Sequence, residues 1–462
     1  AMNWQLILTA MLPEHLLLLG MLAILGLEIR SGRPSDGFGL AVLFTAAAAV
    51  AAFWLYATGF TGAPFLHHFS VGPVASLPKA VLLALAVPVL LISRDDFAET
   101  PYYTLVLASL YGACLIISSD SFPTLFLGIE IMSLPVYALV LLGLMRAQSV
   151  EAALKYLVLG GAATATLLMG IAFLYGWSGS LSISAFPFAL ASGDPLALAG
   201  VALITAALFL KAAVVPFHAW APDAYEGASA PVTAYMATII KAGVLLAALR
   251  VFGTMPVVAP VAGLIAVLPL VSMAWGNLAA IRQTSFRRMI AYSSIAHAGY
   301  LFYALLGDGR GRWEAIVFYL IAYGLMNVLA FAALPRGADD ERQDRLDALK
   351  GLYYRRPFAA IMIAIAMLSL AGLPPLPGFA AKFLVFKNVL AAGYTGYAVA
   401  GLVASYLGLY FYLRVIQYMF MAEQEPTAAR GAPRRLAVIA SVLCLVPAIL
   451  LTFFPGWLID RL

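Results

Sequence analysis

Charged residues are scarce in this chain of 462 residues. Asp, Glu, Lys and Arg make up 11% of the sequence, whereas they make up about 25% of an average soluble domain. Hydrophobic residues fill 63% of it, and a soluble protein of this length has too small an interior to bury so much apolar surface. The scarcity of charge therefore excludes an ordinary soluble domain.

Cysteine and histidine are also rare. Cys114 and Cys444 lie in separate apolar runs, so their spacing indicates neither a disulfide framework nor a thiolate metal site. The histidines are too scattered along the chain to form a haem-binding or metal-binding helix; they are His15, His67, His68, His218 and His297. We therefore predict no metal site in this chain.

Long apolar runs dominate what is present. A helix of about 20 apolar residues spans the hydrocarbon core of a bilayer, and runs of this length recur throughout the chain. The sequence predicts an all-α polytopic membrane protein with about 14 transmembrane helices. The expected spans cover residues 12–29, 38–58, 76–93, 101–118, 121–145, 151–176, 196–219, 229–252, 256–280, 285–306, 313–334, 357–390, 396–421 and 435–455.

Two of these spans are interrupted by proline. The span 196–219 contains Pro216, and the span 357–390 contains Pro374, Pro375 and Pro377. Because proline removes a backbone donor and clashes with the preceding turn, both spans are predicted to be broken helices. Unpaired backbone at membrane depth is tolerated only where protein or a water-filled cavity surrounds it.

Lys and Arg are distributed unevenly between the two sets of alternate loops. One set contains Arg30, Arg33, Arg94, Arg146, Arg282, Arg287, Arg288, Arg336, Arg342, Arg345, Lys350, Arg355, Arg356, Arg430, Arg434 and Arg435. The other set contains only Lys79, Arg250, Arg310, Arg312, Lys387 and Arg461. Because cytoplasmic loops are enriched in Lys and Arg, this bias places both termini on the non-cytoplasmic side.

The sequence repeats itself weakly at a spacing of about 164 residues. "EAALKYLVLGG" at Glu151–Gly161 matches "EAIVFYLIAYG" at Glu314–Gly324, and "LRV" occurs at both 249–251 and 413–415. The spacing covers an odd number of spans, so the two copies must cross the membrane in opposite directions. We predict three helices in residues 1–100, inverted five-helix repeats in residues 101–253 and 254–421, each with one broken helix, and a final helix in residues 422–462.

Four charged residues lie deep within predicted spans: Glu130, Lys211, Lys241 and Lys382. Each such residue costs about 2.5–3.5 kcal/mol at a helix centre, and buried charges in membrane helices commonly mark ion or proton pathways. Burial disfavours an ammonium and a nearby carboxylate stabilises it, so a pair of Glu130 with a lysine near a neutral lysine can exchange one proton. We interpret these four residues as proton-translocation sites.

Two histidines are candidate proton relays. His218 and Lys211 flank the break at Pro216, where a side chain can meet water and pass a proton. His297, in "SSIAHAGY", is either a relay or a hydrogen-bonding partner of a neighbouring helix. Beyond the break, Asp223 and Glu226 fit a cytoplasmic mouth, although a solvated loop is the simpler interpretation.

Other charges have simpler explanations than proton transfer. Lys155 stands four residues after Glu151, so an i,i+4 ion pair or snorkelling explains it about as well as function does. We expect Arg250 and Arg414 to snorkel toward the membrane surface and Lys387 to be an interfacial anchor.

The repeat also predicts how many proton paths exist. At the spacing of 164 residues His218 aligns with Lys382, and Glu130 aligns with Ser294. The first copy therefore holds more titratable groups. This asymmetry predicts a single lateral path, from the first copy through His297 toward Lys382.

Several segments resemble the antiporter-like membrane subunits of proton-translocating NADH:quinone oxidoreductase, respiratory complex I. They are "FLGIEIMSLPVYALVLLG", "LKAAVVPFHAWAPDAYEGASAPVTAYM", "RMIAYSSIAHAGY" and "LAGLPPLPGFAAKF". The resemblance covers nearly the whole chain. Subunit N is the most similar, because Lys382 stands where subunit M has a glutamate and the chain is too short for subunit L.

The resemblance implies a role for each candidate. Glu130 and Lys211 match the glutamate–lysine pair of the family, Lys241 its central lysine and Lys382 its terminal lysine, with His218 and His297 at relay positions. The chain itself is implied to carry no redox cofactor. NAD, FMN, iron–sulfur clusters and quinone are expected in partner subunits of a complex in the bacterial inner membrane, which includes a neighbouring antiporter-like subunit.

Two other functions are compatible with the sequence. A subunit of a multisubunit sodium/proton antiporter shares the fold and most of these charges. A structural membrane subunit, whose buried charges only fix helix packing, is disfavoured because lone buried charges are costly. No nucleic-acid partner is expected, since the basic residues follow membrane topology.

Overall fold

The structure is a computed structural model that describes residues 3–31, 37–97, 100–257, 261–307, 309–336, 344–421 and 434–462. The chain divides into two compact units. Unit 1 contains Ala1–Ala212, Gly227–Val232 and Ile239–Val261. Unit 2 contains Ala213–Glu226, Thr233–Thr238 and Ala262–Leu462.

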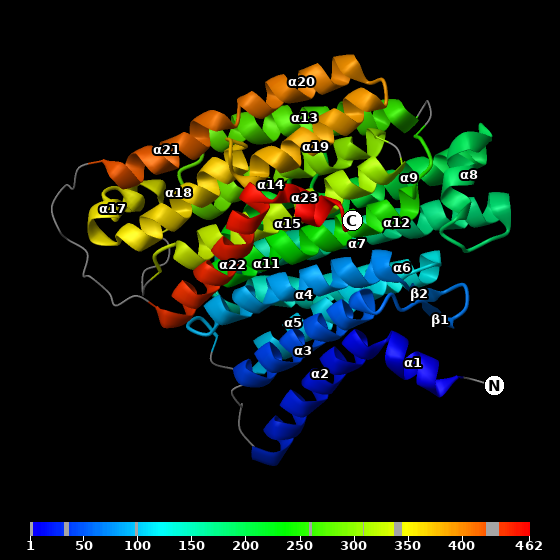
Figure 1. Cartoon of the computed structure of the whole chain (residues 1–462), viewed down its shortest axis with the longest axis horizontal. Helices are drawn as coiled ribbons and strands as arrows, with labels where there is room; N and C mark the ends of the chain where they lie inside the picture. Colours follow the sequence, from blue (N-terminus) through cyan, green and yellow to red (C-terminus); the bar gives the residue numbers. More distant parts are fainter. Residues whose placement is uncertain are drawn as a thin grey trace. The chain divides into compact units, whose positions relative to one another are not determined.

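Helices make up nearly all of unit 1 (Figure 1). They are α1 (Trp4–Ala10), α2 (Leu12–Ser31), α3 (Phe38–Ala57), α4 (Pro73–Ser93), α5 (Thr100–Ile117), α6 (Phe122–Leu142), α7 (Ala147–Ser178), α8 (Ala185–Ser192), α9 (Pro195–Ala212) and α12 (Lys241–Phe252). A hairpin of β1 (Gly62–Phe65) and β2 (Phe69–Val71) lies between α3 and α4.

Unit 2 is also helical. Its elements are α13 (Val261–Ile281), α14 (Phe286–Tyr303), the 3-10 turn Ala304–Leu306, α15 (Gly309–Ala333), the 3-10 turn Leu346–Leu349, α17 (Leu352–Arg355), α18 (Pro357–Ala371), α19 (Pro377–Ala391), α20 (Thr395–Tyr406), α21 (Leu409–Phe420), α22 (Arg435–Phe453) and α23 (Pro455–Ile459). The division between the units falls within α10 (Trp220–Gly227), α11 (Ala230–Tyr235) and the π-helix Met236–Ile240.

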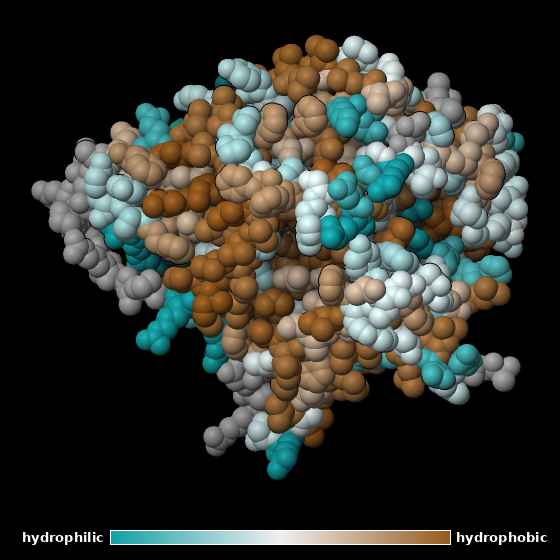
Figure 2. All heavy atoms as spheres, in the orientation of Figure 1, coloured by the Kyte–Doolittle hydropathy of each residue, from teal (hydrophilic) through white to brown (hydrophobic). Residues whose placement is uncertain are grey.

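The all-α membrane fold is confirmed. Among the described residues, 12 helices are long and apolar enough to cross a membrane, and Pro101–Ile117 and Pro357–Ala371 are shorter apolar helices. Every one of the expected spans coincides with one helix or with a consecutive pair. Figure 2 shows hydrophobic residues over much of the drawn surface, as expected for helices that face lipid. The figure of 14 membrane crossings stays a prediction.

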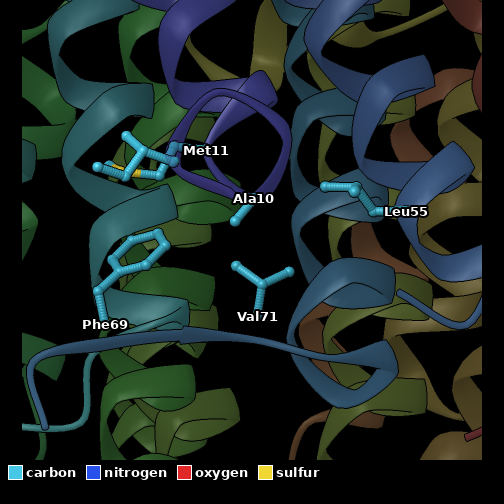
Figure 3. Packing of buried hydrophobic residues seen from close by; sticks show 6 residues of the cluster. Ala10, Met11, Leu55, Phe69 and Val71 are labelled. Carbon is cyan, nitrogen blue, oxygen red and sulfur yellow. The ribbon is translucent and has the colours of Figure 1, made fainter. Parts of the chain in front are cut away.

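The β-hairpin was not predicted. Its strands are only four and three residues long, and the segment contains Gly62, Pro64 and a turn in which His67 has a φ of 65°, so the sequence reads as a loop. Phe69 and Val71 nevertheless point into a small apolar cluster with Met11 and Leu55 (Figure 3). The hairpin thereby closes one end of the α1–α3 region.

Both predicted breaks are present. α9 ends at Ala212, the next residue Ala213 has a φ of 61°, and helix resumes at Trp220. α18 ends at Ala371, Gly372 has a φ of 86°, and α19 begins at Pro377. Left-handed residues of this kind end a helix by turning the chain away from its axis.

The two breaks differ in length, which corrects one detail of the repeat. Residues 213–219 separate the first pair of half-helices and residues 372–376 separate the second. His218 therefore lies in the non-helical link, whereas Lys382 lies inside α19, so the two are not equivalent positions. A constant spacing of 164 residues fails here because the links are not equally long.

Candidate functional site

The first candidate site is an ion pair inside unit 1. Lys211, in the last turn of α9, directs its Nζ to Glu130 Oε1 of α6 at 3.1 Å, and both side chains are largely buried. Two neutral groups complete the contacts. Thr164 of α7 donates to Glu130 Oε1 at 2.5 Å, and Lys211 lies 3.4 Å from the Tyr137 hydroxyl.

The sequence indicated Glu130 and Lys211 but not their neutral neighbours. Tyr137 and Thr164 are ordinary residues of apolar helices by composition, so only folding reveals that they surround the pair. Gly160 explains how they fit, because a Cβ at that position would collide with the Tyr137 hydroxyl. Glycine at 160 therefore lets Tyr137 reach the lysine.

A second lysine also meets the end of α9. Lys241 directly follows the π-helix Met236–Ile240 and donates from Nζ to the carbonyl oxygen of Ala212 at 2.8 Å. Ala212 is the last residue of α9, where helix carbonyls lack partners and the helix dipole is negative. The half-helix terminus thus stabilises a positive charge at this point.

Lys382 repeats this arrangement in unit 2. Its Nζ donates to the carbonyl oxygen of Ala371, the last residue of α18, at 3.0 Å. The ammonium also lies 4.9 Å from the centroid of the Tyr300 ring, within cation–π distance. In both units, then, a buried lysine rests on the carboxyl end of a broken half-helix.

A cavity of about 530 Å³ reaches Lys382. It is lined by the Ala371–Leu373 link and by residues of α19, α20 and α21, including Lys387 and Ser405. A space of this size is large enough to hold several water molecules, each of which takes about 30 Å³ in the liquid. Lys387 is exposed, as an interfacial anchor would be.

His297 belongs to a hydrogen-bonded chain within unit 2. Its Nδ1 lies 2.7 Å from the Tyr319 hydroxyl, and its Nε2 lies 3.0 Å from the Tyr412 hydroxyl. Tyr412 in turn lies 2.5 Å from the Ser293 hydroxyl. Because imidazole and hydroxyl groups both donate and accept, such a chain can pass a proton along it.

The surroundings of His297 extend toward the broken helix. A cavity of about 10 Å³, close to the smallest that holds one water molecule, is lined by His297, Tyr323, Ser369 and Gly378 among others. Ser369 of α18 accepts a hydrogen bond from the Gly378 amide of α19 at 3.0 Å. The tyrosines of this region had no signal in the sequence, since aromatic residues in membrane helices are mostly packing residues.

His218 lies in the non-helical link and has one defined partner. Trp275 Nε1 donates to His218 Nε2 at 3.0 Å. A ring nitrogen that accepts a hydrogen bond carries no proton, so the imidazole is in its neutral form with the proton on Nδ1. His218 is half-buried, and among the described residues Nδ1 has no hydrogen-bond partner.

Asp223 and Glu226 are not a simple solvated loop. Both lie on α10, and Arg288 of α14 donates to Asp223 Oδ1 at 2.8 Å and to Glu226 Oε2 at 2.9 Å. Tyr225, on the same short helix, lies 3.1 Å from the Ser294 hydroxyl. The interpretation as a solvated loop is therefore wrong, because the basic end of α14 recruits both carboxylates.

The remaining charges mostly follow the simpler interpretations. Lys155 forms an i,i+4 ion pair of 2.6 Å with Glu151 and both side chains are exposed. Arg414 donates to the Ile281 and Gln283 carbonyls at 2.6 and 2.7 Å. Arg250 pairs with Asp120 at 2.5 Å. The two arginines are therefore held by protein groups, and snorkelling is not needed to explain them.

One buried ion pair was missed. Lys79 was counted as a loop charge, but it lies inside α4, buried, and pairs with Glu14 of α2 at 2.5 Å. Its Nζ also lies 4.8 Å from the Phe69 ring centroid. Glu14 stands near the start of its span and Lys79 near the start of another, so neither position looked deep in the sequence.

Comparison with known proteins places these geometries in a family. The family described as NADH:quinone oxidoreductase/Mrp antiporter, TM matches residues 119–408. The chain belongs to this family. All seven predicted site residues, from Glu130 to Lys382, lie within the matched range.

Relatives with printed functions narrow the likeness. NADH-quinone oxidoreductase subunit N of Pelobacter propionicus is 40% identical over 419 residues, covering 91% of this chain and 90% of that protein. A chain of respiratory complex I from Thermus thermophilus with bound aureothin is 33% identical, with a TM-score of 0.83 and coverage of 97% and 98%. The predicted membership of the complex I subunit N group is confirmed.

The rival function has a structural counterpart as well. A chain of the Mrp complex from Dietzia sp. has a TM-score of 0.83 at 23% identity and covers 97% of this chain and 96% of that one. At that identity the likeness concerns the fold alone. The relatives at higher identity therefore favour subunit N over the antiporter.

Proposed function

We propose that this membrane subunit of NADH-quinone oxidoreductase translocates protons, using Glu130, Lys211, Lys241 and Lys382 as its proton-carrying groups. The observation that carries the proposal is the placement of Lys241 and Lys382 on the last carbonyls of two broken half-helices. A helix end of this kind is a weak, fixed negative pole, which holds a proton on a buried lysine without trapping it. A full carboxylate partner would hold it more firmly.

The Glu130–Lys211 pair supplies a controllable contrast to those lysines. At 3.1 Å the carboxylate stabilises the ammonium, whereas separation of the two leaves a buried charge that favours release of a proton. A conformational change elsewhere in the complex that moves α6 against α9 would therefore change the affinity of Lys211 for its proton. This step needs no redox group in the chain.

The histidines and tyrosines serve the same proposal as relays. The Tyr319–His297–Tyr412 chain connects α14, α15 and α21 by hydrogen bonds of 2.7 and 3.0 Å. His218, neutral in the structure, can take up a proton when Trp275 releases its Nε2. The cavity at Lys382 offers water access to the terminal lysine. We assign Lys155 no role, since its exposed pair explains it.

We further propose that the complex resides in a bacterial inner membrane, with both termini of this chain on the non-cytoplasmic side. The excess of Lys and Arg in alternate loops supports this orientation. NAD, FMN, iron–sulfur clusters and quinone are assigned to partner subunits, in keeping with the printed activity of the relatives, which is that of an NADH-quinone oxidoreductase. A neighbouring antiporter-like subunit is expected.

Native electrophoresis of mildly solubilised membranes tests the assignment. The gel is stained for NADH dehydrogenase activity, and this chain is tracked by mass spectrometry. We expect it in a large NADH-oxidising band, and variants at Glu130 and Lys211 are then assayed for proton pumping. A small inactive band that contains sodium/proton antiporter subunits would replace the proposal by the rival.

A further inference from the structure

A second cavity lies at one end of unit 2, away from the residues assigned to proton transfer. It encloses about 290 Å³ and is lined by the C-terminal end of α15, the junction of α17 and α18, and the start of α22. α15 packs against both α18 and α22. The lining includes Arg336, Arg355, Arg356 and Arg434.

These arginines give the cavity a concentrated positive charge. No described lining residue is acidic, and among the described residues neither Arg355 nor Arg356 forms an ion pair. Arg355 is held in place instead by neutral groups, because its Nη2 donates to the Ala348 and Lys350 carbonyls at 3.0 and 2.7 Å. All four guanidinium groups are only partly exposed. Such a cluster is suited to an anion that accepts several hydrogen bonds.

The rest of the lining is apolar and continues onto lipid-facing helix surfaces. Ala332, Leu334, Phe358 and Val438 line the cavity beside the arginines. Further along the same helices, Ile361 of α18 and Val442 of α22 are exposed. The anionic and apolar surfaces therefore follow one another along the helix axes.

The position of the cavity matches the depth of a lipid headgroup. The apolar span of α15 ends at Ala333, α18 begins at Pro357 and α22 begins at Arg435. Three helix ends thus meet where the apolar spans stop. In Figure 1, α17, α18 and the first turns of α22 lie toward the same side of the drawing. The loop charges assign this end to the cytoplasmic leaflet.

We propose that this cavity binds the phosphate of an anionic phospholipid, with the acyl chains lying along α18 and α22. Basic pockets between membrane helices on the cytoplasmic side are suited to such headgroups. A free phosphate would use the arginines but would have no use for the apolar lining or for the exposed rows below it. The combination of both surfaces at one depth favours a lipid as the occupant.

Native mass spectrometry of the delipidated complex tests the proposal. The complex is mixed in detergent with phosphatidylglycerol, with phosphatidylcholine, or with phosphatidylglycerol plus excess inorganic phosphate. We expect wild-type complex to retain phosphatidylglycerol in preference to phosphatidylcholine. The double variant Arg355→Gln/Arg434→Gln should bind it about thirtyfold more weakly, since each basic residue near a membrane surface contributes about a fivefold change.

Two controls separate lost binding from lost folding. Arg345→Gln removes an exposed arginine that pairs with Asp347 outside the cavity, and it should leave lipid retention unchanged. Arg355→Lys/Arg434→Lys keeps the charge and should weaken retention by only a few fold, because lysine loses the forked hydrogen bonds but keeps the attraction. Mobility on a native gel reports whether each complex remains assembled.

Three results would overturn the proposal. Equal retention of phosphatidylglycerol by wild type and by the Gln double variant would show that the arginines do not select the lipid. Displacement of the lipid by inorganic phosphate at equal concentration would identify a free-anion site. Binding only after Asp339→Asn/Asp340→Asn/Glu341→Gln would show that these acidic residues, which lie outside the described residues, supply the counter-charge.

Discussion

At the scale of single residues, the buried charges of this chain are stabilised in three different ways. Lys211 has a carboxylate partner in Glu130, Lys241 rests on the Ala212 carbonyl, and Lys382 adds a ring face to the Ala371 carbonyl. A full charge, a helix terminus and a quadrupole hold a cation with different strength. This gradation is what lets neighbouring lysines hold protons unequally.

Replacement of Glu130 by Gln should abolish most proton pumping. The amide keeps the shape and the contact with Thr164 but cannot carry the negative charge that Lys211 faces. We expect the pumping rate to fall by about a hundredfold or more, the range for loss of a side chain that transfers protons. Proton uptake by membrane vesicles during NADH oxidation measures it.

The control for that variant is Glu151→Gln. Glu151 is an exposed carboxylate of α7 paired with Lys155, and it should pump at the wild-type rate. A Glu130→Gln complex that pumps as fast as Glu151→Gln would remove Glu130 from the proton pathway.

The tyrosine chain around His297 gives a second residue-scale prediction. Tyr319→Phe removes the hydroxyl that meets His297 Nδ1 and leaves that nitrogen without its buried partner. Loss of a buried hydrogen bond costs about 1–3 kcal/mol, so we expect pumping to fall by about tenfold. Tyr303→Phe is the matched control, because the Tyr303 hydroxyl is buried and has no partner among the described residues. Equal pumping by the two variants would mean that His297 needs no relay partner.

At the scale of elements, glycine and small residues set how closely the half-helices approach. Gly378 of α19 lies so near the Ser369 carbonyl of α18 that a side chain would not fit. Gly372 has a positive φ and ends α18 just where Lys382 reaches back to it. The geometry of the lysine site therefore depends on residues that carry no charge.

Gly372→Ala should damage the Lys382 site without unfolding the unit. The new Cβ would lie 2.8 Å from Lys382 Cδ, and alanine at a φ of 86° is strained by about 1–2 kcal/mol. We expect reduced pumping with normal assembly. Gly396→Ala on α20, where a Cβ meets nothing within 4 Å, should pump normally. If Gly372→Ala also pumps normally, the contact of Lys382 with the helix end is not needed.

The Glu14–Lys79 pair fixes α2 against α4 and gives a stability prediction. Lys79→Met leaves a buried, uncompensated carboxylate, and such losses cost about 3–5 kcal/mol. Thermal unfolding of the solubilised chain should shift to a lower temperature. Glu14→Leu/Lys79→Met should recover most of the loss, because an apolar pair of similar volume replaces a buried ion pair at little cost. A double variant as unstable as the single one would contradict this explanation.

At the scale of the whole molecule, the question is whether the two units carry one proton path or two. Both have a broken helix with a lysine on its last carbonyl, but only unit 1 adds a glutamate–lysine pair. This unequal endowment agrees with the single path predicted from the sequence. Two complete paths would need a comparable pair in each.

Lys382→Ala tests the single path. If protons leave only through the terminal lysine, this variant should pump as poorly as Glu130→Ala, in the vesicle assay described above. If instead Lys382→Ala retains about half of the rate while Glu130→Ala abolishes it, the path does not end at Lys382. NADH oxidation by the solubilised complex serves as the control for assembly.

Much of this protein follows from its sequence because a membrane imposes simple rules. Apolar runs become helices, prolines break them, and charges in greasy spans need partners, so the helices, the two breaks and the buried residues Glu130, Lys211, Lys241 and Lys382 could be predicted. None of these inferences requires knowledge of which helices touch.

The partners of those charges were decided only by the tertiary structure. A hydrogen bond joins groups that packing brings together, so no local pattern marks Thr164, Tyr319 or the Ala371 carbonyl as partners. The Lys79–Glu14 pair and the arginine cavity arise in the same way, from helix ends far apart in sequence. The sequence by itself determined which residues are costly to bury, and the packing of the helices decided what stabilises each of them.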